Sequence, residues 1–383
     1  MGVPKPIEEH IIANPDEIIP SNENMKVIGV CNPGGTLFKN KEGTKFYLLL
    51  RVTEGPKIDF SGHIAFPRAI PNNEDKYIVR WEWERLGKDA KINGPNSLVT
   101  LECEERVKPR NISHFRLAES DDGINFTISE TPTLFPQTKY EEFGIEDARI
   151  TKLNEAIIIG EDSYDYLISY VACSEEYDVC TAFALTNDFK NFVRIPKDDP
   201  GIMFYAPSKD VVVFPKKFIN PRTKKENYLA LTRPNGMARY MVPSIFLSYS
   251  NDLFHWGDHR ILIKGDEKGH VGAGPAPIEC EEGWLVIDHQ HRHLSDGTKE
   301  YVGRSYLLDK KNPQKIIKKS KEFIEPHLNL DEDSIVENVT FPSAAMIKDN
   351  KIYIYTGEDD VLAAVHIYDL NEFLNFLSPV ENC

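Results

Sequence analysis

The chain of 383 residues has no apolar run long enough to cross a membrane, because charged and polar residues occur at short intervals along its whole length. The first residues lack the apolar core of a secretory signal, and Gly2 stands in no convincing myristoylation context. Six cysteines are scattered without a Cys-x-x-Cys pair, which favours a reduced chain over a disulfide framework. We therefore expect a cytoplasmic protein with no membrane partner.

Positive charge is also in short supply. Lysine and arginine number 45 against 60 aspartates and glutamates, for a formal net charge of -15. Such a chain repels phosphate backbones, so we expect no nucleic-acid partner. In so acidic a chain, any local gathering of lysine, arginine and histidine indicates a site for an anion.

Helical periodicity is scarce, and short β-rich runs that begin with an aromatic residue recur instead. Five such runs occur in the chain: Tyr47–Arg51, Tyr166–Tyr170, Tyr228–Thr232, Trp284–Asp288 and Tyr353–Gly357. From the second to the fifth, successive copies lie roughly 55 to 70 residues apart, the length of a four-stranded sheet with its turns. The repeat predicts an all-β fold, a five-bladed β-propeller.

A second repeat, out of phase with the first, supports this prediction. Strands run into a Ser/Thr-x-Asp sequence at Asp122, Asp188 and Asp252, and an aromatic residue follows each aspartate by four positions. Short polar side chains that bond their own backbone form turns. We interpret these aspartates as turn formers without a chemical role.

The continuous repeat indicates one domain spanning residues 1–383. Residues 1–28 look like an amino-terminal strap, and the charged stretch 53–110 is an insertion in the first blade, either a functional lid or a surface hairpin. Apolar residues at helical spacing from Tyr368 predict a short helix within a closing segment, residues 366–383.

Upstream of each aromatic-led run lies a segment rich in polar residues and glycine, which we assign to the innermost strands around a central funnel. If side chains alternate along the strand, Asp147 and Arg149 share a face and Glu146 points the other way. This arrangement places one carboxylate beside a guanidinium, either in a structural ion pair or in a site. Lys209, Arg233 and His289 add positive charge at the same level.

Several of these stretches together resemble glycoside hydrolase family 130, from about Asn32 to about Asp360. The resemblance rests on Gly144–Thr151, Val213–Pro215, Leu231–Pro234, Gly272–Ile278 with Gly283–Leu285, and Asn338–Pro342, in this order. Each motif alone is weak, and their order makes the resemblance specific.

The resemblance implies an inverting phosphorylase of β-mannosides, or an inverting β-mannosidase. It makes Asp147 the general acid, acting through a mannosyl hydroxyl, and places phosphate among Arg149, Lys209, Arg233 and His289. Inorganic phosphate is then a co-substrate, and no cofactor or metal is implied. Physical reasoning agrees, because a hydrolase needs a second group to activate water whereas phosphate is already an anionic nucleophile that needs cations to hold it.

The substrate is expected to be a small carbohydrate held by polar side chains. We assign this role to Asn32, Arg51, His114, Arg116, Asp210, Asp359 and Asp360, and possible acceptor contacts to Trp81, Trp83 and Arg110. The segment around His114 and Arg116 resembles members that act on β-1,2-linked mannose. We expect cleavage of β-1,2-mannobiose or β-1,2-oligomannan to α-mannose 1-phosphate, the alternatives being β-1,4-mannosyl-glucose and mannosyl-N-acetylglucosamine linkages.

Some features leave alternatives open. Relatives have Tyr-His-Gly where this chain has Asp288–His293, with histidines at 289, 291 and 293 that project together without a cysteine or carboxylate set for a metal. A β-mannosidase using Asp147 with a glutamate such as Glu279, or a non-catalytic propeller, would also fit parts of the pattern. The sequence leaves open whether the chain forms a homo-oligomer.

Overall fold

The computed structural model describes residues 3–41, 43–57, 62–71, 76–85, 90–93, 98–101, 106–234, 240–267, 269–293, 299–325 and 338–380. Nearly all regular structure in these ranges is β-strand, together with one α-helix near the carboxyl end, α1 (Leu370–Phe376). The all-β prediction and the short carboxyl-terminal helix are therefore confirmed. No helix in the described ranges is both long enough and apolar enough to span a membrane.

The first sheet contains nine strands of the described chain. Its members are β2 (Met25–Asn40), β3 (Gly43–Pro56), β9 (Ile112–Ser120), β10 (Thr127–Ile128), β11 (Gly144–Ile159), β12 (Asp162–Ser174), β13 (Asp178–Thr186), β14 (Val193–Arg194) and β15 (Ile202–Phe204). Two antiparallel halves, β2–β3–β9 and β11–β12–β13–β14, meet at a parallel pairing of Gly144 with Ser113. The sheet is therefore two antiparallel units joined at one point.

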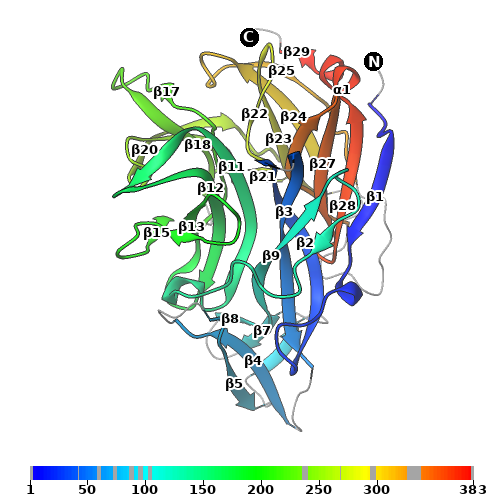
Figure 1. Ribbon diagram of the computed structural model, residues 1–383, viewed down its shortest axis with the longest axis vertical. Coiled ribbons are helices and arrows are strands. Elements are labelled where there is room, and N and C mark those ends of the chain that lie inside the picture. Colours follow the sequence, from blue (N-terminus) through cyan, green and yellow to red (C-terminus); the bar gives the residue numbers. More distant parts are fainter. Residues whose placement is uncertain are drawn as a thin grey trace.

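Three further large sheets follow along the chain. The first contains β16 (Ser208–Val213), β17 (Phe218–Ile219), β18 (Glu226–Pro234), β19 (Ile245–Ser250) and β20 (Trp256–Ile263). The second contains β21 (Val271–Ala273), β22 (Ile278–Glu279), β23 (Gly283–His293), β24 (Lys299–Asp309), β25 (Ile316–Lys319) and β29 (Ser378–Pro379). The third contains β26 (Thr340–Lys348), β27 (Lys351–Glu358), β28 (Leu362–Asp369) and β1 (Glu8–Ala13). In Figure 1, β11 and β21 run through the middle of the view, and the later strands of their sheets lie farther out.

All five aromatic-led runs are strands, and each pairs antiparallel with the polar segment that precedes it. They lie in β3, β12, β18, β23 and β27, which pair with β2, β11, β16, β21 and β26 respectively. Their apolar side chains fill the space between neighbouring antiparallel units. For example, Tyr47 of β3 and Tyr166 of β12 both pack on Phe189, with ring centroids 5.5 and 5.0 Å away.

The Ser/Thr-x-Asp turns also form as predicted. The carboxylate of Asp122 accepts hydrogen bonds from the backbone N–H groups of Ile124 and Asn125, and Asp188 and Asp252 repeat this pattern. These bonds lower the pKa of the Asp122 carboxyl although its partial burial acts in the opposite direction. The aspartates are therefore structural.

The chain ends and the insertion differ in detail from the sequence prediction. The strap contains a real strand, because β1 pairs antiparallel with β28, and β2 begins at Met25, before the predicted strap ends. Helix α1 starts at Leu370 rather than Tyr368, since the Asp369 side chain caps it by accepting from Glu372 N–H.

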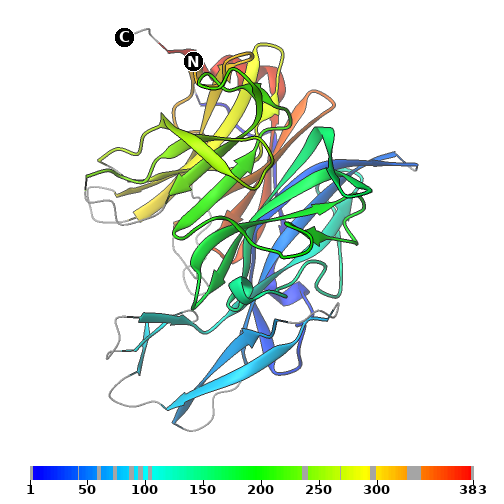
Figure 2. The same cartoon turned by 90° about the vertical axis from the view of Figure 1, so that its left-hand side faces the viewer.

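The insertion forms two small sheets rather than one hairpin. These are β4 (His63–Ala69) with β5 (Val79–Arg85), and β6 (Ala90–Asn93) with β7 (Leu98–Leu101) and β8 (Arg106–Pro109). Figures 1 and 2 both show the insertion projecting from one end of the molecule, the end where β3 finishes and β9 begins.

His366 of β28 joins the amino-terminal strand to the last sheet. Its Nδ1 lies 3.1 Å from Glu9 Oε1 of β1, and its Nε2 lies 3.5 Å from Glu358 Oε1 of β27. Burial alone would lower the pKa of His366, but the two carboxylates outweigh it and raise the pKa above its usual range. The charged imidazole therefore stabilises the contact of β1 with this sheet.

Because the pKa of His366 is raised on folding, its contribution to stability is present below pH 6.5 and is lost as the pH rises through the folded-state value. We predict that His366→Gln lowers the free energy of unfolding by about 2 kcal/mol at pH 6. The difference from wild type should shrink as the pH rises toward 9. Denaturant unfolding at several pH values measures this. The matched control is His255→Gln, an exposed histidine beside Asp252, which should change little. A gap that is constant with pH would contradict the assignment.

Candidate functional site

Three of the strands that precede the aromatic-led runs, β2, β11 and β16, carry a β-bulge that contains a polar residue. The pairing register shifts between Cys31 and Gly34 in β2, between Glu146 and Arg149 in β11, and between Lys209 and Val212 in β16. Inside these bulges, Asn32, Asp147 and Asp210 have φ angles of 44°, 52° and 53°. Asparagine and aspartate are the non-glycine residues that tolerate this left-handed conformation best. The bulges re-aim the three side chains.

Asp147 is the common contact of side chains from three other strands. Its Oδ1 accepts from Asn32 Nδ2 at 2.9 Å and from Arg51 Nη1 at 3.1 Å. Its Oδ2 lies 3.7 Å from Lys209 Nζ. Asp147 is buried, and so is Asn32. The sequence-predicted residues Asn32, Arg51, Asp147 and Lys209 therefore form one cluster.

The charges in this cluster set its protonation. Burial would raise the pKa of Asp147, but Arg51, Lys209 and Arg149 outweigh burial and lower it to about 2, with help from the Asn32 hydrogen bond. Burial would lower the pKa of Lys209, yet the carboxylates of Asp147, Glu146 and Asp210 raise it. Without a bound anion, the acid is thus a carboxylate and the lysine a cation.

The prediction that Glu146 points away from Asp147 is wrong. Arg51 Nη2 donates to Glu146 Oε1 at 2.8 Å, while Nη1 of the same guanidinium binds Asp147. The bulge after Glu146 breaks the alternation of side chains on which the prediction depended. The cluster therefore contains two neighbouring carboxylates, both on the Arg51 side.

Arg149 does not pair with the Asp147 carboxylate. Its Nε donates to the Gly274 carbonyl at 2.7 Å, and its Nη1 donates to the Asp147 carbonyl at 3.0 Å. Its guanidinium lies 5.4 Å from the centre of the Phe341 ring. Nη2 is buried and has no hydrogen-bond partner among the described residues. A buried guanidinium nitrogen in this state is a ready donor for an anion.

Asp210 holds two of the predicted phosphate-binding residues. Its Oδ2 lies 2.6 Å from Arg233 Nε, in ion-pair contact without hydrogen-bond geometry, and 3.3 Å from His289 Nε2. Burial opposes ionisation of Asp210, but Arg233 and His289 dominate and lower its pKa. A Cβ at Gly272 would lie 2.1 Å from this oxygen, so only glycine fits there. Asp210 was predicted to bind sugar, and the structure instead places it as the partner of Arg233.

The two aspartates after β27 occupy different positions. Asp360 Oδ1 lies 3.4 Å from Asn32 Nδ2, which brings it next to the Asp147 cluster. Asp359 Oδ1 accepts from the Val339 backbone N–H at 2.8 Å, so this oxygen braces the chain before β26. Asp360 is the better placed of the two to meet a sugar hydroxyl.

His114 and Arg116 do not join the cluster. Both lie on β9, opposite Val52 and Leu50, and so project from the sheet face opposite to Arg51 and Phe115. Arg116 donates to His114 Nε2 at 3.2 Å and to the carbonyls of Ile19 and Glu130. This buried network ties the strap to the first sheet. A contact of these two side chains with sugar is not supported by their position.

The two tryptophans of the insertion differ in exposure, since Trp81 is partly buried and Trp83 is exposed. Trp81 packs against the small apolar cluster of Met25, Ala69 and Ile112, whereas Trp83 is exposed. Arg110 is half-buried at the end of the insertion. The insertion is attached to β3 a few residues beyond Arg51, so it lies at the same end of the strands as the cluster.

Tyr301, Phe341 and His270 belong to the site but were missed in the sequence. Phe341 packs against His289, with ring centroids 4.0 Å apart, and Tyr301 lies 6.1 Å from the same imidazole. His270 Nε2 is 3.3 Å from the Tyr301 hydroxyl. No repeat marks these residues, because Tyr301 lies on β24, Phe341 lies on β26 and His270 lies just before β21. The Asn-x-Thr-Phe-Pro motif is the one signal that could have indicated Phe341.

The histidine run was the strongest candidate for a metal site. His291 lies 4.9 Å from His293 and 4.8 Å from His270, measured between ring centroids. Among the residues that the structure describes, no group of three or more histidine, cysteine, aspartate or glutamate side chains is arranged to hold a metal ion. These imidazoles contact each other and Tyr301.

Glu279, the alternative catalytic carboxylate, lies elsewhere. It contacts Lys216 and Lys310 at 3.5 Å each and pairs with Trp284 in β23. His289 is five residues farther along the same strand, about 17 Å at the usual rise of a strand. The structure therefore separates Glu279 from the cluster.

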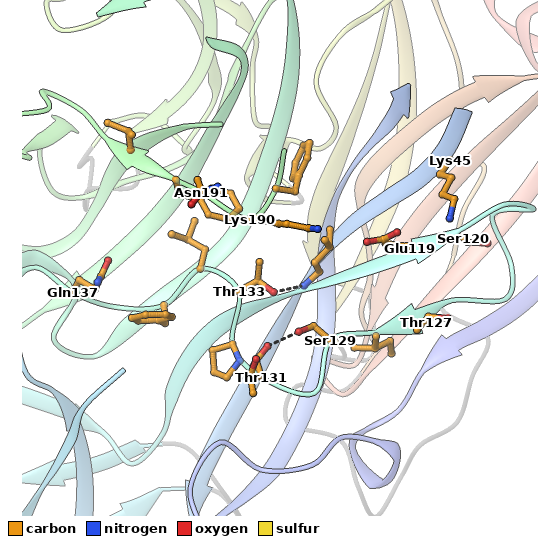
Figure 3. Close-up of a pocket in the computed structure, with 18 of the residues that line it drawn as sticks. Lys45, Glu119, Ser120, Thr127, Ser129, Thr131, Thr133, Gln137, Lys190 and Asn191 are labelled. Atoms are coloured by element: carbon orange, nitrogen blue, oxygen red, sulfur yellow. Dashed lines mark hydrogen bonds between the residues drawn. The ribbon is translucent and has the colours of Figure 1, made fainter. Parts of the chain in front are cut away.

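A cavity of about 1070 Å³ lies between β9 with β10 and the segment Phe189–Arg194 (Figure 3). None of its lining residues is one of the site residues described above. Two of its hydroxyl groups form hydrogen bonds with the backbone: Thr133 Oγ1 accepts from Leu117 N–H, and Ser129 Oγ donates to the Thr131 carbonyl (Figure 3). This cavity is separate from the Asp147 cluster.

Known proteins show similarity over nearly the whole chain. The sequence profile of glycoside hydrolase family 130, described as β-1,4-mannooligosaccharide phosphorylase, matches residues 105–379. A β-1,2-mannobiose phosphorylase of Listeria innocua is 30% identical over 97% of both chains. A 1,2-β-oligomannan phosphorylase of Thermoanaerobacter is 31% identical over 68% of this chain and 80% of that protein.

A solved structure agrees with these matches. The β-1,2-mannobiose phosphorylase of Listeria innocua, in complex with β-1,2-mannobiose, superposes with a TM-score of 0.79 at 28% identity. The superposition covers 96% of this chain and 99% of that one. The profile and the full-length relative together assign the chain, which belongs to glycoside hydrolase family 130.

Proposed function

We propose that the protein is an inverting phosphorylase that cleaves β-1,2-linked mannosides with inorganic phosphate and releases α-D-mannose 1-phosphate. The single observation that carries this proposal is the contact of Asp147 with Lys209, whose charged atoms lie 3.7 Å apart. Arg233 is the strand partner of Lys209, and Arg149 is close enough to Asp147 and Arg233 for their charges to affect its pKa. A proton donor beside a group of cations matches the needs of phosphorolysis.

The proposed architecture is a five-bladed β-propeller in one domain. Five antiparallel units support it, with β2, β11, β16, β21 and β26 as their first strands. Side chains link these first strands, as where Ser343 Oγ donates to the Pro33 carbonyl and Thr151 Oγ1 to the Val213 carbonyl. The Arg149 bond to Gly274 joins the second unit to the fourth. First strands that contact one another in this way are typical of an axial channel.

In the proposed reaction, Asp147 gives its proton through a mannosyl hydroxyl to the glycosidic oxygen. The bond from the anomeric carbon to that oxygen breaks, while a phosphate oxygen bonds to the anomeric carbon from the opposite face. The products are the shortened mannoside and a mannose 1-phosphate that still carries the proton of hydrogen phosphate. That proton returns to the Asp147 carboxylate through solvent, which completes the cycle.

The remaining residues divide between the anion and the sugar. Arg149, Lys209 and Arg233 bind phosphate, and Asp210 and Phe341 hold two of these cations in place. Asn32, Arg51 and Asp360 bind the hydroxyls of the mannosyl residue from the opposite side. His289 is buried between Asp210 and Phe341, and burial with its cationic neighbours lowers its pKa, so it serves as a neutral partner of phosphate.

The alternative of a β-mannosidase has less support. An inverting hydrolase needs a base on the face of the sugar opposite to the acid, with room for water between them. Glu146 and Asp147 are bound by one guanidinium and so lie on the same side. The opposite side offers Arg149 and Arg233, which suit an anion.

Two observations favour the β-1,2 linkage over β-1,4. The relative aligned along 97% of the chain is a β-1,2-mannobiose phosphorylase, and a second relative at 31% identity acts on 1,2-β-oligomannan. A Ruminococcus albus β-1,4-mannooligosaccharide phosphorylase is less similar, at 26% identity over 67% of the chain.

The first test of the proposal is phosphate dependence. Wild-type protein incubated with β-1,2-mannobiose should form mannose 1-phosphate only when phosphate is added, and should act less on β-1,4-mannobiose and mannosyl-glucose. Asp147→Asn should lower kcat by at least about a thousandfold because it removes the proton donor but keeps the shape of the side chain, and circular dichroism should show that the variant still folds. Phosphorus NMR and product chromatography give the readout.

Asn32→Ala is a useful companion variant because it removes a sugar contact, while Arg51 and Lys209 still contact the Asp147 carboxylate. It should raise the KM for mannobiose more than the KM for phosphate. Release of free mannose at equal rates with and without phosphate would instead identify a hydrolase, and full activity of Asp147→Asn would exclude its role as the acid.

A second test concerns how Asp147 acquires its proton. A dianion bound near Lys209, Arg149 and Arg233 offsets the charges that hold the pKa of Asp147 near 2. One added charge at about 4 Å contributes on the order of 4 kcal/mol at an intermediate dielectric. We predict that the protein takes up protons when it binds sulfate at pH 5.5, because sulfate is a dianion that does not itself titrate at this pH and Asp147 accepts the proton.

Calorimetry in buffers of different ionisation enthalpy measures this uptake. In Asp147→Asn it should fall by up to one proton per site, and any uptake by His289 and His270 should remain as background. Uptake of equal size in both proteins would show that Asp147 is not coupled to the anion.

A further inference from the structure

We propose that His270 is a positioning residue that orients the Tyr301 hydroxyl toward phosphate. In this arrangement His270 Nε2–H donates to Tyr301 Oη, and the Tyr301 O–H then donates to a phosphate oxygen. The inference rests on the proposed function, since it adds a donor to the phosphate side of the same site.

His270 is held on three sides. Its carbonyl accepts from His291 N–H at 3.0 Å, and its ring stacks on that of His291 with centroids 4.8 Å apart and planes 11° apart. A Cβ at Gly269 would lie 1.7 Å from the His291 carbonyl oxygen, so the chain before β21 presses directly against β23. This packing holds the imidazole with Nε2 3.3 Å from the Tyr301 hydroxyl.

Tyr301 in turn lies beside the groups assigned to phosphate. Its ring centroid is 6.3 Å from that of Phe341 and 6.1 Å from that of His289. The Arg149 guanidinium lies over the same Phe341 ring. Burial raises the pKa of Tyr301, and the charges of Arg233 and Lys209 oppose this shift only in part. The phenol keeps its proton at neutral pH and can donate it.

The protonation of His270 decides which way the hydrogen bond runs. Burial, with the nearby Arg233, His289 and His291, lowers the pKa of His270 to about 3, and Asp210 opposes this shift only in part. The ring is therefore neutral and carries a single N–H. With the proton on Nε2, Tyr301 Oη is the acceptor and its own proton is free. An anion among the cations favours this tautomer, because it accepts the freed O–H.

A double-mutant cycle tests the proposal. His270→Ala should raise the KM for phosphate about tenfold, the size of one hydrogen bond of about 1.4 kcal/mol, with the KM for mannobiose changed less than about twofold. Tyr301→Phe should raise the phosphate KM at least as much. Adding His270→Ala to Tyr301→Phe should have little further effect, because the imidazole acts through the hydroxyl.

A rescue variant and a matched control complete the design. His270→Gln retains an N–H near the position of Nε2 and should recover most of the loss in phosphate KM. His293→Ala removes an exposed histidine of the same run and should leave the kinetics unchanged. Thermal unfolding and sulfate binding by calorimetry, run on every variant, separate loss of fold from loss of anion affinity.

An unchanged phosphate KM in His270→Ala would overturn the inference. An equal increase in the Tyr301→Phe background would also overturn it, because His270 would then act independently of the hydroxyl. Failure of the proposed function looks different, since wild-type protein would form no mannose 1-phosphate at all.

Discussion

The bulges at Asn32, Asp147 and Asp210, where the backbone is in the left-handed conformation, are the constraint on which the rest of the site depends. A regular strand would send Asp147 and Arg149 to one face and Glu146 to the other. The bulge instead lets Arg51 hold both carboxylates and lets Arg149 reach across to the Gly274 carbonyl. Residues other than glycine pay about 1 kcal/mol or more in this conformation, so the surrounding hydrogen bonds must hold it.

Charge balance is the second condition for a site buried this deeply. Arg51, Lys209 and Arg233 each face a carboxylate, so the cluster is close to neutral although most of its members are buried. Removing one partner of a buried pair commonly costs about 3 to 5 kcal/mol, because the other charge is left in a poor solvent. Arg149 differs, since carbonyl oxygens satisfy two of its nitrogens and one nitrogen is left over. The left-over donor is the feature that most clearly favours an anionic substrate.

The sequence predicted the strands and turns better than it predicted individual contacts. Strand repeats and Asp-centred turns are local patterns, so the five aromatic-led strands and the turns at Asp122, Asp188 and Asp252 could be found from the chain alone. Clustering of Asp147 with Lys209 followed from the common position of their segments, each just upstream of an aromatic-led run. The predicted direction of the Glu146 side chain was wrong because the prediction assumed a regular strand, and the alternation of side chains breaks at a bulge.

Longer-range relations were beyond the sequence. Asp210 was assigned to sugar, but the side chain that it binds, Arg233, comes from the neighbouring strand, and the close approach of Gly272 seals it in. His114 and Arg116 resemble a sugar-contact segment, yet the sheet face on which they lie could be decided only from the pairing of β9 with β3. His270 and Tyr301 are 31 residues apart, and His270 lies just before β21 whereas Tyr301 lies on β24.

The pairing of β1 with β28 has a consequence for how the chain reaches its native state. Glu8 lies opposite Ile367, so a sheet near the end of the chain is finished by residues from its beginning. Contacts of such long sequence separation form late, because a large loop must close first. During synthesis, β1 must wait for β28 to emerge from the ribosome before it has its partner. Until then the backbone groups of β1 are unpaired, and such strands are surfaces on which nascent chains associate with each other.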